Sequence, residues 1–266
     1  MTTRSLTYLR ALVIDVDGVL WHGDRALPGV PAFFDFLRAR QIAFTIATNN
    51  SARPASEIIE RLAALGVKVD ADEVLTSAHA TALYLPRLAP RGARVLAIGG
   101  DGLQDELTRA GYALVDQNAD LVVVGIDWDL TYDKLKRAAL EIQRGAKFIG
   151  TNADKTYPGA EGIIPGAGAI LAALQAATEV APLVIGKPER AMYDIAVEKM
   201  GAARDAAAML GDRLDTDIEG AQRAGLTSIL LLTGVTTRES LARSTVQPDF
   251  IFADLDTLRE AWRRGY

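Results

Sequence analysis

The 266-residue sequence contains no cysteine and only two histidines, His22 and His79. The lack of cysteine excludes disulfides, thiolate metal sites and cysteine nucleophiles, and two histidines are too few for a histidine metal site. We therefore expect a reducing compartment, the cytoplasm. Low-complexity tracts, runs of like charge and Ser/Gly linkers are also lacking, so composition alone marks no domain boundary.

Long hydrophobic runs are also scarce, and acidic residues outnumber basic ones, 34 to 29. The apolar run before Asp15 is too short for a signal-peptide core and far too short to span a bilayer, so no membrane partner is expected. A net charge of −5 argues against a nucleic-acid surface. With 49% hydrophobic and 24% charged residues, the composition is that of an ordinary soluble globular protein.

Runs rich in Val, Ile and Leu alternate with amphipathic segments of helical length, which is typical of a parallel sheet covered by helices. We predict a doubly wound, Rossmann-like α/β core built from both ends of the chain. Its expected strands are 11–15, 43–47, 183–185, 207–210, 228–232 and 250–252, and its expected helices are 31–40, 54–65, 77–88, 189–200, 216–224 and 255–262.

The middle of the chain has an α/β rhythm of its own. Its expected strands are 94–98, 121–125 and 147–149, and its expected helices are 102–110, 131–144 and, after a polar loop, 169–177. Roughly 100 residues are enough for a small domain. We predict a core domain of residues 1–82 and 182–266 and a smaller inserted α/β domain of residues 83–181.

Polar side chains follow four of the predicted core strands. They are Asp15 and Asp17 after LVI, Thr48-Asn49-Asn50-Ser51 after FTIA, Lys187 after PLVIG, and Gly211-Asp212 with Asp215 and Asp217 after AAML. The C-terminal ends of parallel strands meet at one edge of the sheet, where ligands bind. We therefore expect acids, hydroxyl groups and a cation to gather there.

Several carboxylates at one edge repel one another unless a cation neutralises them. Hard oxygen ligands suit Mg²⁺, which takes one or two protein carboxylates plus substrate phosphate. Lys187 adds a point charge for phosphate, and Thr48 with the following amides makes an anion cradle. Each of these features also has a purely structural interpretation. Asp212 could stabilise a turn, residues 48–51 could cap a helix, and Lys187 could be a solvated cation. Their joint occurrence at four strand ends favours a catalytic site instead.

The motifs DVDGVL, TNNS, GKP and GDRLDTD, in this order, resemble the four signature motifs of the haloacid dehalogenase-like superfamily of phosphatases. The long middle insertion resembles the branch with a large α/β cap between the second and third motifs. That branch includes p-nitrophenylphosphatases, phosphoglycolate phosphatases and nucleotide monophosphatases. The stretch FIGTNADKTYPGAEGIIPGAGAI resembles its substrate-facing loop, and the resemblance covers essentially the whole chain.

The resemblance implies that Asp15 is the nucleophile that takes the phosphoryl group. It implies that Asp17 protonates the leaving alcohol and then activates water. Thr48 would bind the phosphoryl oxygens with the amide of Asn49, and Lys187 would hold the nucleophile and the phosphate together. Asn50 is expected beside Asn49 in the same substrate-binding motif.

The resemblance also implies a Mg²⁺ site. Its ligands would be the carboxylate of Asp15, the backbone carbonyl of Asp17 and the carboxylate of Asp212. Asp217 would either order the waters of the metal or orient Lys187.

We therefore predict a Mg²⁺-dependent phosphatase that hydrolyses small phosphomonoesters, such as p-nitrophenyl phosphate, sugar phosphates, phosphoglycolate or nucleotides, through an aspartyl-phosphate. One alternative is a phosphotransferase or mutase of the same superfamily, which would protect its phospho-enzyme from water. Another is a phospho-aspartate signalling domain, although the motif at 211–217 and the insertion count against it. A small phosphorylated metabolite is the expected partner, and the oligomeric state is left open, a homo-oligomer included.

Overall fold

Strands and helices alternate along the computed structural model, which describes residues 5–159 and 161–265. The strands are β1 (Ala11–Ile14), β2 (Trp21–His22), β3 (Arg25–Ala26), β4 (Ala43–Thr48), β5 (Val74–Thr76), β6 (Arg94–Ile98), β7 (Ala113–Leu114), β8 (Leu121–Val124), β9 (Lys147–Gly150), β10 (Thr156–Gly159), β11 (Gly162–Pro165), β12 (Leu183–Val184), β13 (Ala207–Gly211), β14 (Thr227–Leu231) and β15 (Phe250–Phe252). The α-helices are α1 (Val30–Ala39), α2 (Ala55–Ala64), α3 (Ser77–Tyr84), α4 (Asp101–Arg109), α5 (Tyr132–Gln143), α6 (Ala167–Thr178), α7 (Arg190–Met200), α8 (Glu219–Ala224), α9 (Arg238–Arg243) and α10 (Leu255–Arg263).

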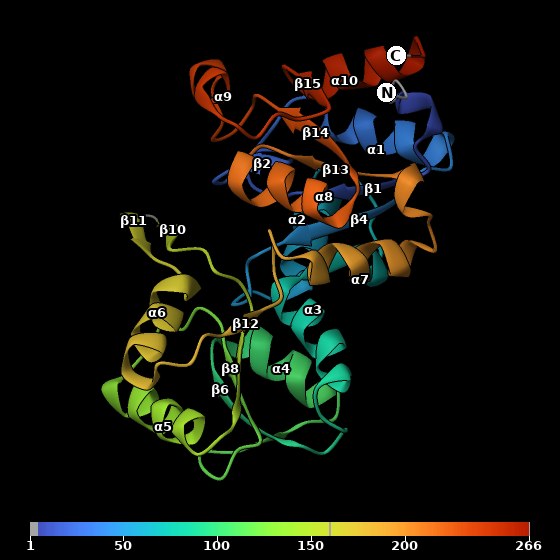
Figure 1. Ribbon diagram of the computed structural model, residues 1–266. Coiled ribbons are helices and arrows are strands. Elements are labelled where there is room, and N and C mark those ends of the chain that lie inside the picture. Colours follow the sequence, from blue (N-terminus) through green and yellow to red (C-terminus); the bar gives the residue numbers. More distant parts are fainter. Residues whose placement is uncertain (1–4, 160, 266) are drawn as a thin grey trace. The chain divides into compact units, whose positions relative to one another are not determined.

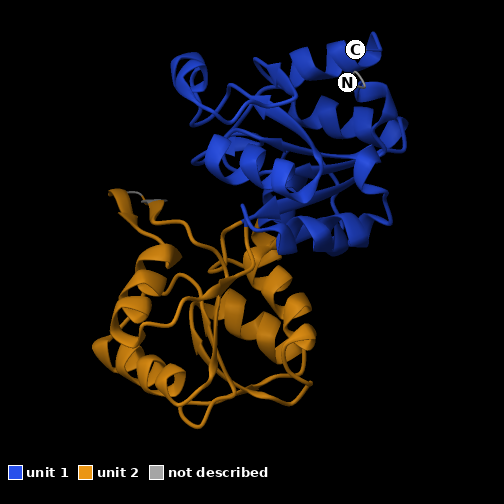
Figure 2. Cartoon of the chain, viewed as in Figure 1, with its two compact units in different colours: residues 1–48, 58–75, 187–266 blue, residues 49–57, 76–186 orange. Residues whose placement is uncertain are grey.

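The chain divides into two units, coloured separately in Figure 2. The first comprises residues 1–48, 58–75 and 187–266, and the second comprises residues 49–57 and 76–186. The predicted domain boundaries follow residues 82 and 181, several residues away from these limits. The difference arises because α3 packs against α4 and so groups with the second unit. The strand predicted at 183–185 for the core is also wrong in its placement, because β12 pairs with β9 in the sheet of the second unit.

A six-stranded sheet in the order β15-β14-β13-β1-β4-β5 forms the centre of the first unit (Figure 1). Strand β1 pairs in parallel with β13 and β4, and β14 pairs in parallel with β13 and β15. Every residue of β1, β13 and β14 is buried. Strands that are buried along their whole length and mostly apolar are typical of a parallel sheet covered on both faces, which confirms the predicted α/β core.

Helices cover both faces of this sheet. Helices α1 and α10 pack together on one face and α7 and α8 on the other (Figure 1). Helix α10 begins with a capping box in which Asp254 accepts from the backbone of Thr257, and its Trp262 lies 1% exposed, with its ring edge-on to Phe36 at 5.7 Å. Burial of these aromatic rings fixes the helices to each other.

The second unit has a sheet of its own, in the order β12-β9-β8-β6-β7, and its pairs are parallel. Figure 1 shows α5 and α6 on one face of this sheet and α3 and α4 on the other. The core beneath α5 and α6 consists of apolar side chains from both helices and from the central strands: Leu96, Ile98, Val122, Val124, Ala138, Ile142, Ala146, Phe148, Ile170, Leu171 and Leu174.

The polar loop predicted before the helix observed as α6 is wrong in part. Residues of that loop form the antiparallel hairpin β10–β11, in which Tyr157 pairs with Ile164. Strand β11 carries two adjacent isoleucines, Ile163 and Ile164, so its sequence lacks the alternation of apolar and polar residues that predicts a strand. None of the described helices combines the length and the apolar character needed to cross a bilayer.

Candidate functional site

Three adjacent parallel strands of the first unit deliver the predicted polar residues to one edge of the sheet. Asp15 directly follows β1 and extends its pairing, because its N–H donates to the carbonyl of Leu210 on β13 at 2.9 Å. Thr48 is the last residue of β4, and Asp212 directly follows β13. Asp15, Thr48 and Asp212 are all buried, at 8%, 5% and 1% exposure, so the sheet holds polar groups where water is largely excluded.

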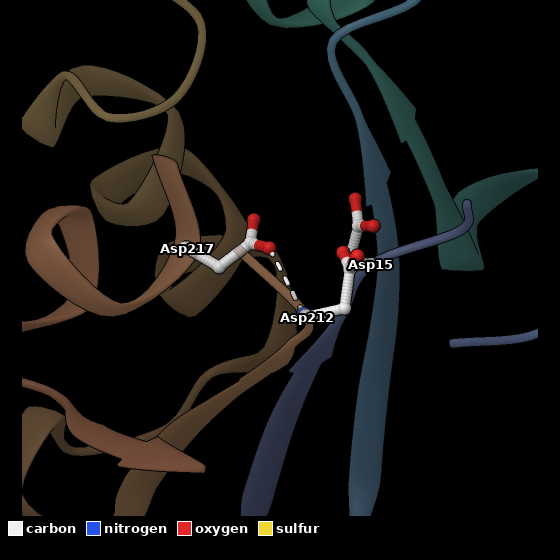
Figure 3. A group of neighbouring side chains, drawn as sticks. All are labelled: Asp15, Asp212 and Asp217. Carbon is white, nitrogen blue, oxygen red and sulfur yellow. Dashed lines mark hydrogen bonds between the residues drawn. The ribbon is translucent and has the colours of Figure 1, made fainter. Parts of the chain in front are cut away.

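Asp15, Asp212 and Asp217 form a buried carboxylate cluster (Figure 3). One oxygen from each carboxylate lies within 4.8 Å of the others. Burial raises the pKa of Asp15 well above its usual range, with Lys187 opposing and the neighbouring carboxylates adding to the rise. Burial, followed by repulsion from Asp217, raises the pKa of Asp212 to about 7. Three carboxylates in this position need positive charge to stay ionised.

Lys187 supplies part of that positive charge. Its Nζ donates to Oδ1 of Asp15 and, at 2.8 Å, to Oδ1 of Asp217. Burial by itself would lower the pKa of Lys187, but the two carboxylates raise it well above its usual range, so the ammonium stays charged. The buried ammonium group of Lys187 therefore links Asp15, which follows β1, to Asp217, in the loop that follows β13.

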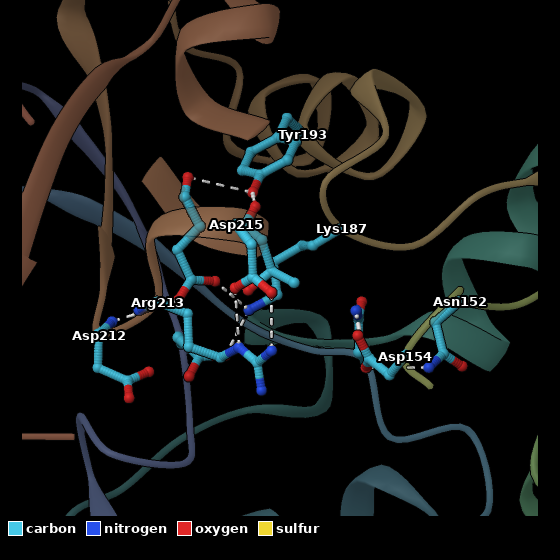
Figure 4. Close-up of polar contacts among 11 residues, drawn as sticks. Asn152, Asp154, Lys187, Tyr193, Asp212, Arg213 and Asp215 are labelled. Carbon is cyan, nitrogen blue, oxygen red and sulfur yellow. Dashed lines mark hydrogen bonds and ion pairs between the residues drawn. The ribbon is translucent and has the colours of Figure 1, made fainter. Parts of the chain in front are cut away.

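Asp217 lies on a π-helical turn, Leu214–Ile218, directly before α8. Its Oδ2 accepts the backbone N–H groups of Asp212 at 3.2 Å and Arg213 at 3.0 Å, while its Oδ1 accepts from Lys187. This contact is the geometry that the role of orienting Lys187 requires, and both roles left open for Asp217 stay predictions. Asp215 instead pairs with Arg213 at the surface and stabilises the turn (Figure 4).

Asp17 lies apart from this cluster. Gly18 turns the chain with a φ of +84°, and a Cβ there would lie 2.5 Å from Oδ2 of Asp212. Val16, between the two aspartates, is buried, whereas the side chain of Asp17 reaches the surface. The surrounding protein still desolvates the Asp17 carboxyl enough to raise its pKa, against the opposing effects of Lys187 and a hydrogen bond from Trp21. A raised pKa suits a group that donates a proton.

The asparagines after β4 have partners within the second unit. Asn49 donates to Asp154 at 3.1 Å, and Asn152 donates to the same carboxylate oxygen at 3.0 Å (Figure 4 labels Asn152 and Asp154). Asn50 donates to the hydroxyl of Tyr157 at 3.4 Å and also accepts from the backbone of residues 52 and 53. The binding of substrate by Asn49 and Asn50 therefore stays a prediction, since these contacts are with the protein itself.

Two residues that lie beside the predicted site residues were not identified from the sequence. Tyr193 on α7 is 1% exposed, and its hydroxyl donates to the carbonyl of Thr216 at 2.7 Å, which supports the turn that carries Asp217. A tyrosine at this helical spacing is indistinguishable from a core residue. Trp21, which forms an isolated β-bridge with Asp17 and whose ring lies 4.1 Å from the guanidinium carbon of Arg61, is the second.

The cluster suits a hard divalent cation. Oδ2 of Asp212 accepts from the backbone N–H of Val235 at 2.6 Å, but its buried Oδ1 has no hydrogen-bond partner among the residues that the structure describes. An unpartnered buried carboxylate oxygen is costly, and a cation beside Asp15 and Asp212 would satisfy it. An all-oxygen donor set is the type that Mg²⁺ prefers.

Comparison with known proteins agrees with this geometry. A family model described as haloacid dehalogenase-like hydrolase matches residues 12–113, and a second, described as HAD-hydrolase-like, matches residues 184–258. The chain is 40% identical over 248 residues to an acid sugar phosphatase of Staphylococcus saprophyticus, which covers 93% of this chain and 95% of that one.

Solved structures resemble the whole chain as well. The 4-nitrophenylphosphatase of Thermotoga maritima has a TM-score of 0.91 and 37% identity, over 96% of this chain and 98% of that one. A glycerol phosphate phosphatase of Mycobacterium tuberculosis, solved in complex with magnesium, has a TM-score of 0.89 and 35% identity, over 98% of this chain and 80% of that one.

Proposed function

The chain belongs to the haloacid dehalogenase-like hydrolase family and is a phosphomonoesterase, and we propose that it hydrolyses small phosphomonoesters through a phosphorylated Asp15 with the help of Mg²⁺. The observation that carries the proposal is the contact of one buried cation, Lys187, with both Asp15 and Asp217 at the edge of a parallel sheet. This arrangement holds a carboxylate nucleophile in place beside positive charge, as phosphoryl transfer requires.

The proposed reaction has two steps. In the first, a carboxylate oxygen of Asp15 attacks phosphorus, the bond from phosphorus to the ester oxygen breaks, and Asp17 gives its proton to the departing alkoxide. In the second, Asp17 takes a proton from water, the water oxygen attacks phosphorus, and the bond to Asp15 breaks to release phosphate. Asp17 is thereby restored as an acid, and Asp15 as a carboxylate.

Lys187 and Thr48 stabilise the charge that moves in both steps. Lys187 keeps its proton because of its two carboxylate partners, so its charge is available to the phosphoryl oxygens. General acid–base catalysis supplies typically ~10²–10⁴ in rate, whereas enzymes accelerate phosphate-monoester hydrolysis by up to ~10²¹. Positioning and electrostatics therefore have to supply most of the acceleration.

Asp15 and Asp212 are the carboxylates that would hold Mg²⁺, together with the backbone carbonyl of Asp17. Once bound, Mg²⁺ neutralises the carboxylates and the phosphate and orients the phosphate for attack. The unpartnered Oδ1 of Asp212 supports this assignment.

The names of the relatives support small organic phosphates as substrates. They are an acid sugar phosphatase, a 4-nitrophenylphosphatase and a glycerol phosphate phosphatase. Hydrolysis of such esters, with water as the acceptor, is favoured over transfer to a second substrate or storage of the phosphoryl group.

A panel of phosphorylated sugars, polyols and nucleotides, with p-nitrophenyl phosphate as reference, tests the proposal. We expect free phosphate to equal the alcohol released, and an acid quench during turnover to leave one phosphate on the peptide that carries Asp15. The Asp15→Asn variant should lose both signals, and Asp215→Asn, which removes an acid from the neighbouring surface turn, should keep them. Full activity of Asp15→Asn, or phosphate passed to an acceptor rather than to water, would contradict the proposal.

A further inference from the structure

Lys187 and Tyr193 come from one short segment of the first unit and both contact Asp217. Lys187 lies in the loop before α7, and Tyr193 lies on α7 itself (Figure 4 labels both residues). Nζ of Lys187 donates to Oδ1 of Asp217 at 2.8 Å, whereas the hydroxyl of Tyr193 lies 3.3 Å from the backbone carbonyl oxygen of Asp217. One segment therefore attaches Asp217 at two points, its side chain and its backbone.

The hydroxyl of Tyr193 is held in a narrow place. Its stronger bond is to the carbonyl of Thr216, at 2.7 Å, and the side chain is 1% exposed. A Cβ at Gly220, on α8, would lie only 2.3 Å from the hydroxyl oxygen. The lack of a side chain at Gly220 thus lets the hydroxyl come close enough to reach the carbonyls of the turn.

The turn that carries Asp217 has an uncommon winding. The N–H of Ile218 donates to the carbonyl of Arg213 at 3.1 Å, and the N–H of Glu219 donates to the carbonyl of Leu214, which is the π-helical pattern. Single π-helical turns are rare and occur often at functional sites. Successive residues of a helix differ by about 100° in direction, so a return to α-helical winding would turn the Asp217 side chain away from its present position.

The winding of the turn decides where the two carboxylate oxygens of Asp217 lie. Oδ2 accepts the backbone N–H groups of Asp212 and Arg213, and Oδ1 accepts from Nζ of Lys187. Because Lys187 is buried, water cannot easily replace a carboxylate that moves away from it. A shift of Asp217 would therefore change the direction in which the ammonium group of Lys187 points.

We propose that Tyr193 is a positioning residue whose hydroxyl holds the π-helical turn in the winding that places the Asp217 carboxylate against Lys187. The inference rests on the proposed role of Lys187 in stabilising the phosphoryl group. The hydroxyl is bonded to backbone carbonyls and not to a reacting group, so Tyr193 acts through Asp217, and Asp217 acts through Lys187.

Two variants disturb the hydroxyl in different ways. Tyr193→Phe removes it and keeps the ring that fills the buried space, and Gly220→Ala keeps it but places a methyl group against it. Tyr112→Phe is the matched control, because Tyr112 in the second unit is also buried and its hydroxyl has no hydrogen-bond partner within the part of the chain that the structure describes. The assay measures kcat and KM for p-nitrophenyl phosphate with Mg²⁺ in excess.

We expect Tyr193→Phe to lower kcat about tenfold while KM changes less than about threefold. The substrate phosphate would keep Thr48 and Mg²⁺ as partners, so its binding should suffer less than the chemical steps. Gly220→Ala should cause a similar fall in kcat, and Tyr112→Phe should leave both constants unchanged. Each variant is assayed at a temperature at which circular dichroism shows that it is folded.

The decisive measurement repeats Tyr193→Phe and Gly220→Ala in an Asp217→Ala background. No carboxylate is left to be positioned there, so neither change should lower kcat further. A general loss of packing would instead multiply the separate losses, because it does not depend on Asp217. Multiplied losses would overturn the positioning role.

The outcomes also separate the inference from the proposed function. If Lys187→Met loses activity but Tyr193→Phe and Gly220→Ala do not, the positioning role is wrong and the proposed function stands. If Lys187→Met keeps full activity, the proposed role of Lys187 fails and the inference fails with it. Should Tyr193→Phe not fold, Gly220→Ala decides, since it retains both the ring and the hydroxyl.

Discussion

Nζ of Lys187 lies 2.8 Å from Oδ1 of Asp217 in a part of the protein where the two side chains are 3% and 1% exposed. The same ammonium contacts Asp15. A buried cation between carboxylates is stable only as long as every member keeps its partner, because an unpaired buried charge is expensive. This dependence gives the first prediction.

Lys187→Met should destabilise the metal-free protein by about 3–5 kcal/mol, since it leaves three buried carboxylates without their cation. Urea unfolding in the presence of a chelator measures the change in the free energy of unfolding. The control is Lys199→Met, because Lys199 faces the exposed Asp72 at 4.0 Å and such pairs contribute less than about 1 kcal/mol. If the free energy of unfolding fell equally in the two variants, the buried contacts of Lys187 would contribute no more to stability than an exposed ion pair.

Mg²⁺ should raise the thermal midpoint of the protein, and Asp212→Asn should remove most of that rise. The reason is that Asp212 offers a buried oxygen without a partner among the described residues. A ligand at 100 times its Kd stabilises the folded state by about 2.7 kcal/mol. Thermal unfolding with chelator and with Mg²⁺ gives the shift, and Asp215→Asn should show the full shift. A normal shift in Asp212→Asn would place the cation elsewhere.

The stabilisation by Mg²⁺ should also weaken as the pH falls from about 8 to 6. Burial and the nearby Asp217 raise the pKa of Asp212 to about 7 in the absence of metal. Below that pH the carboxyl group is protonated and the proton competes with the cation, whereas above it the carboxylate is free to bind. Isothermal titration with Mg²⁺ at several pH values checks this, and affinity that stays constant over the range would contradict it.

Gly18→Ala should be more damaging than the same change at a comparable glycine. Gly18 and Gly66 have similar φ values, +84° and +80°, so alanine is strained by about 1–2 kcal/mol at either position. At Gly66 a Cβ would meet no described atom within 4 Å, whereas at Gly18 it would lie 2.5 Å from Oδ2 of Asp212. We expect an additional cost of about 1–3 kcal/mol and a loss of Mg²⁺ stabilisation in Gly18→Ala alone. If Gly18→Ala and Gly66→Ala had the same stability and the same stabilisation by Mg²⁺, Asp212 could move away from the new methyl group without affecting the fold or metal binding.

The sequence predicts the parallel core and its site to a large extent. Buried runs such as ALVI in β1 and AAMLG in β13 are long enough to identify strands without tertiary information. Once the strands are parallel, the polar residues that follow them have to meet at one edge. The positions of Asp15, Thr48 and Asp212 at neighbouring strand ends follow from this rule.

Side-chain partners depend on the tertiary structure. The sequence leaves two roles for Asp217, and only the packing of the π-helical turn brings its carboxylate to Lys187, 30 residues away. Likewise, the side chains of Asn49 and Asn50 meet residues more than 100 positions along the chain, Asp154 and Tyr157. No local pattern encodes such distances, because a hydrogen bond depends on where each backbone finally lies.

The sequence by itself determined most strands of the two larger sheets, the order of the motifs and the family, because hydrophobic periodicity and motif spacing are local properties of the chain. Only the tertiary structure decided the surroundings of the two aspartates of the first motif, to which the resemblance had already given different roles. Asp15 is buried against Lys187, whereas Asp17 is exposed and is followed by a turn at Gly18. That separation arises from contacts between segments that the sequence keeps apart.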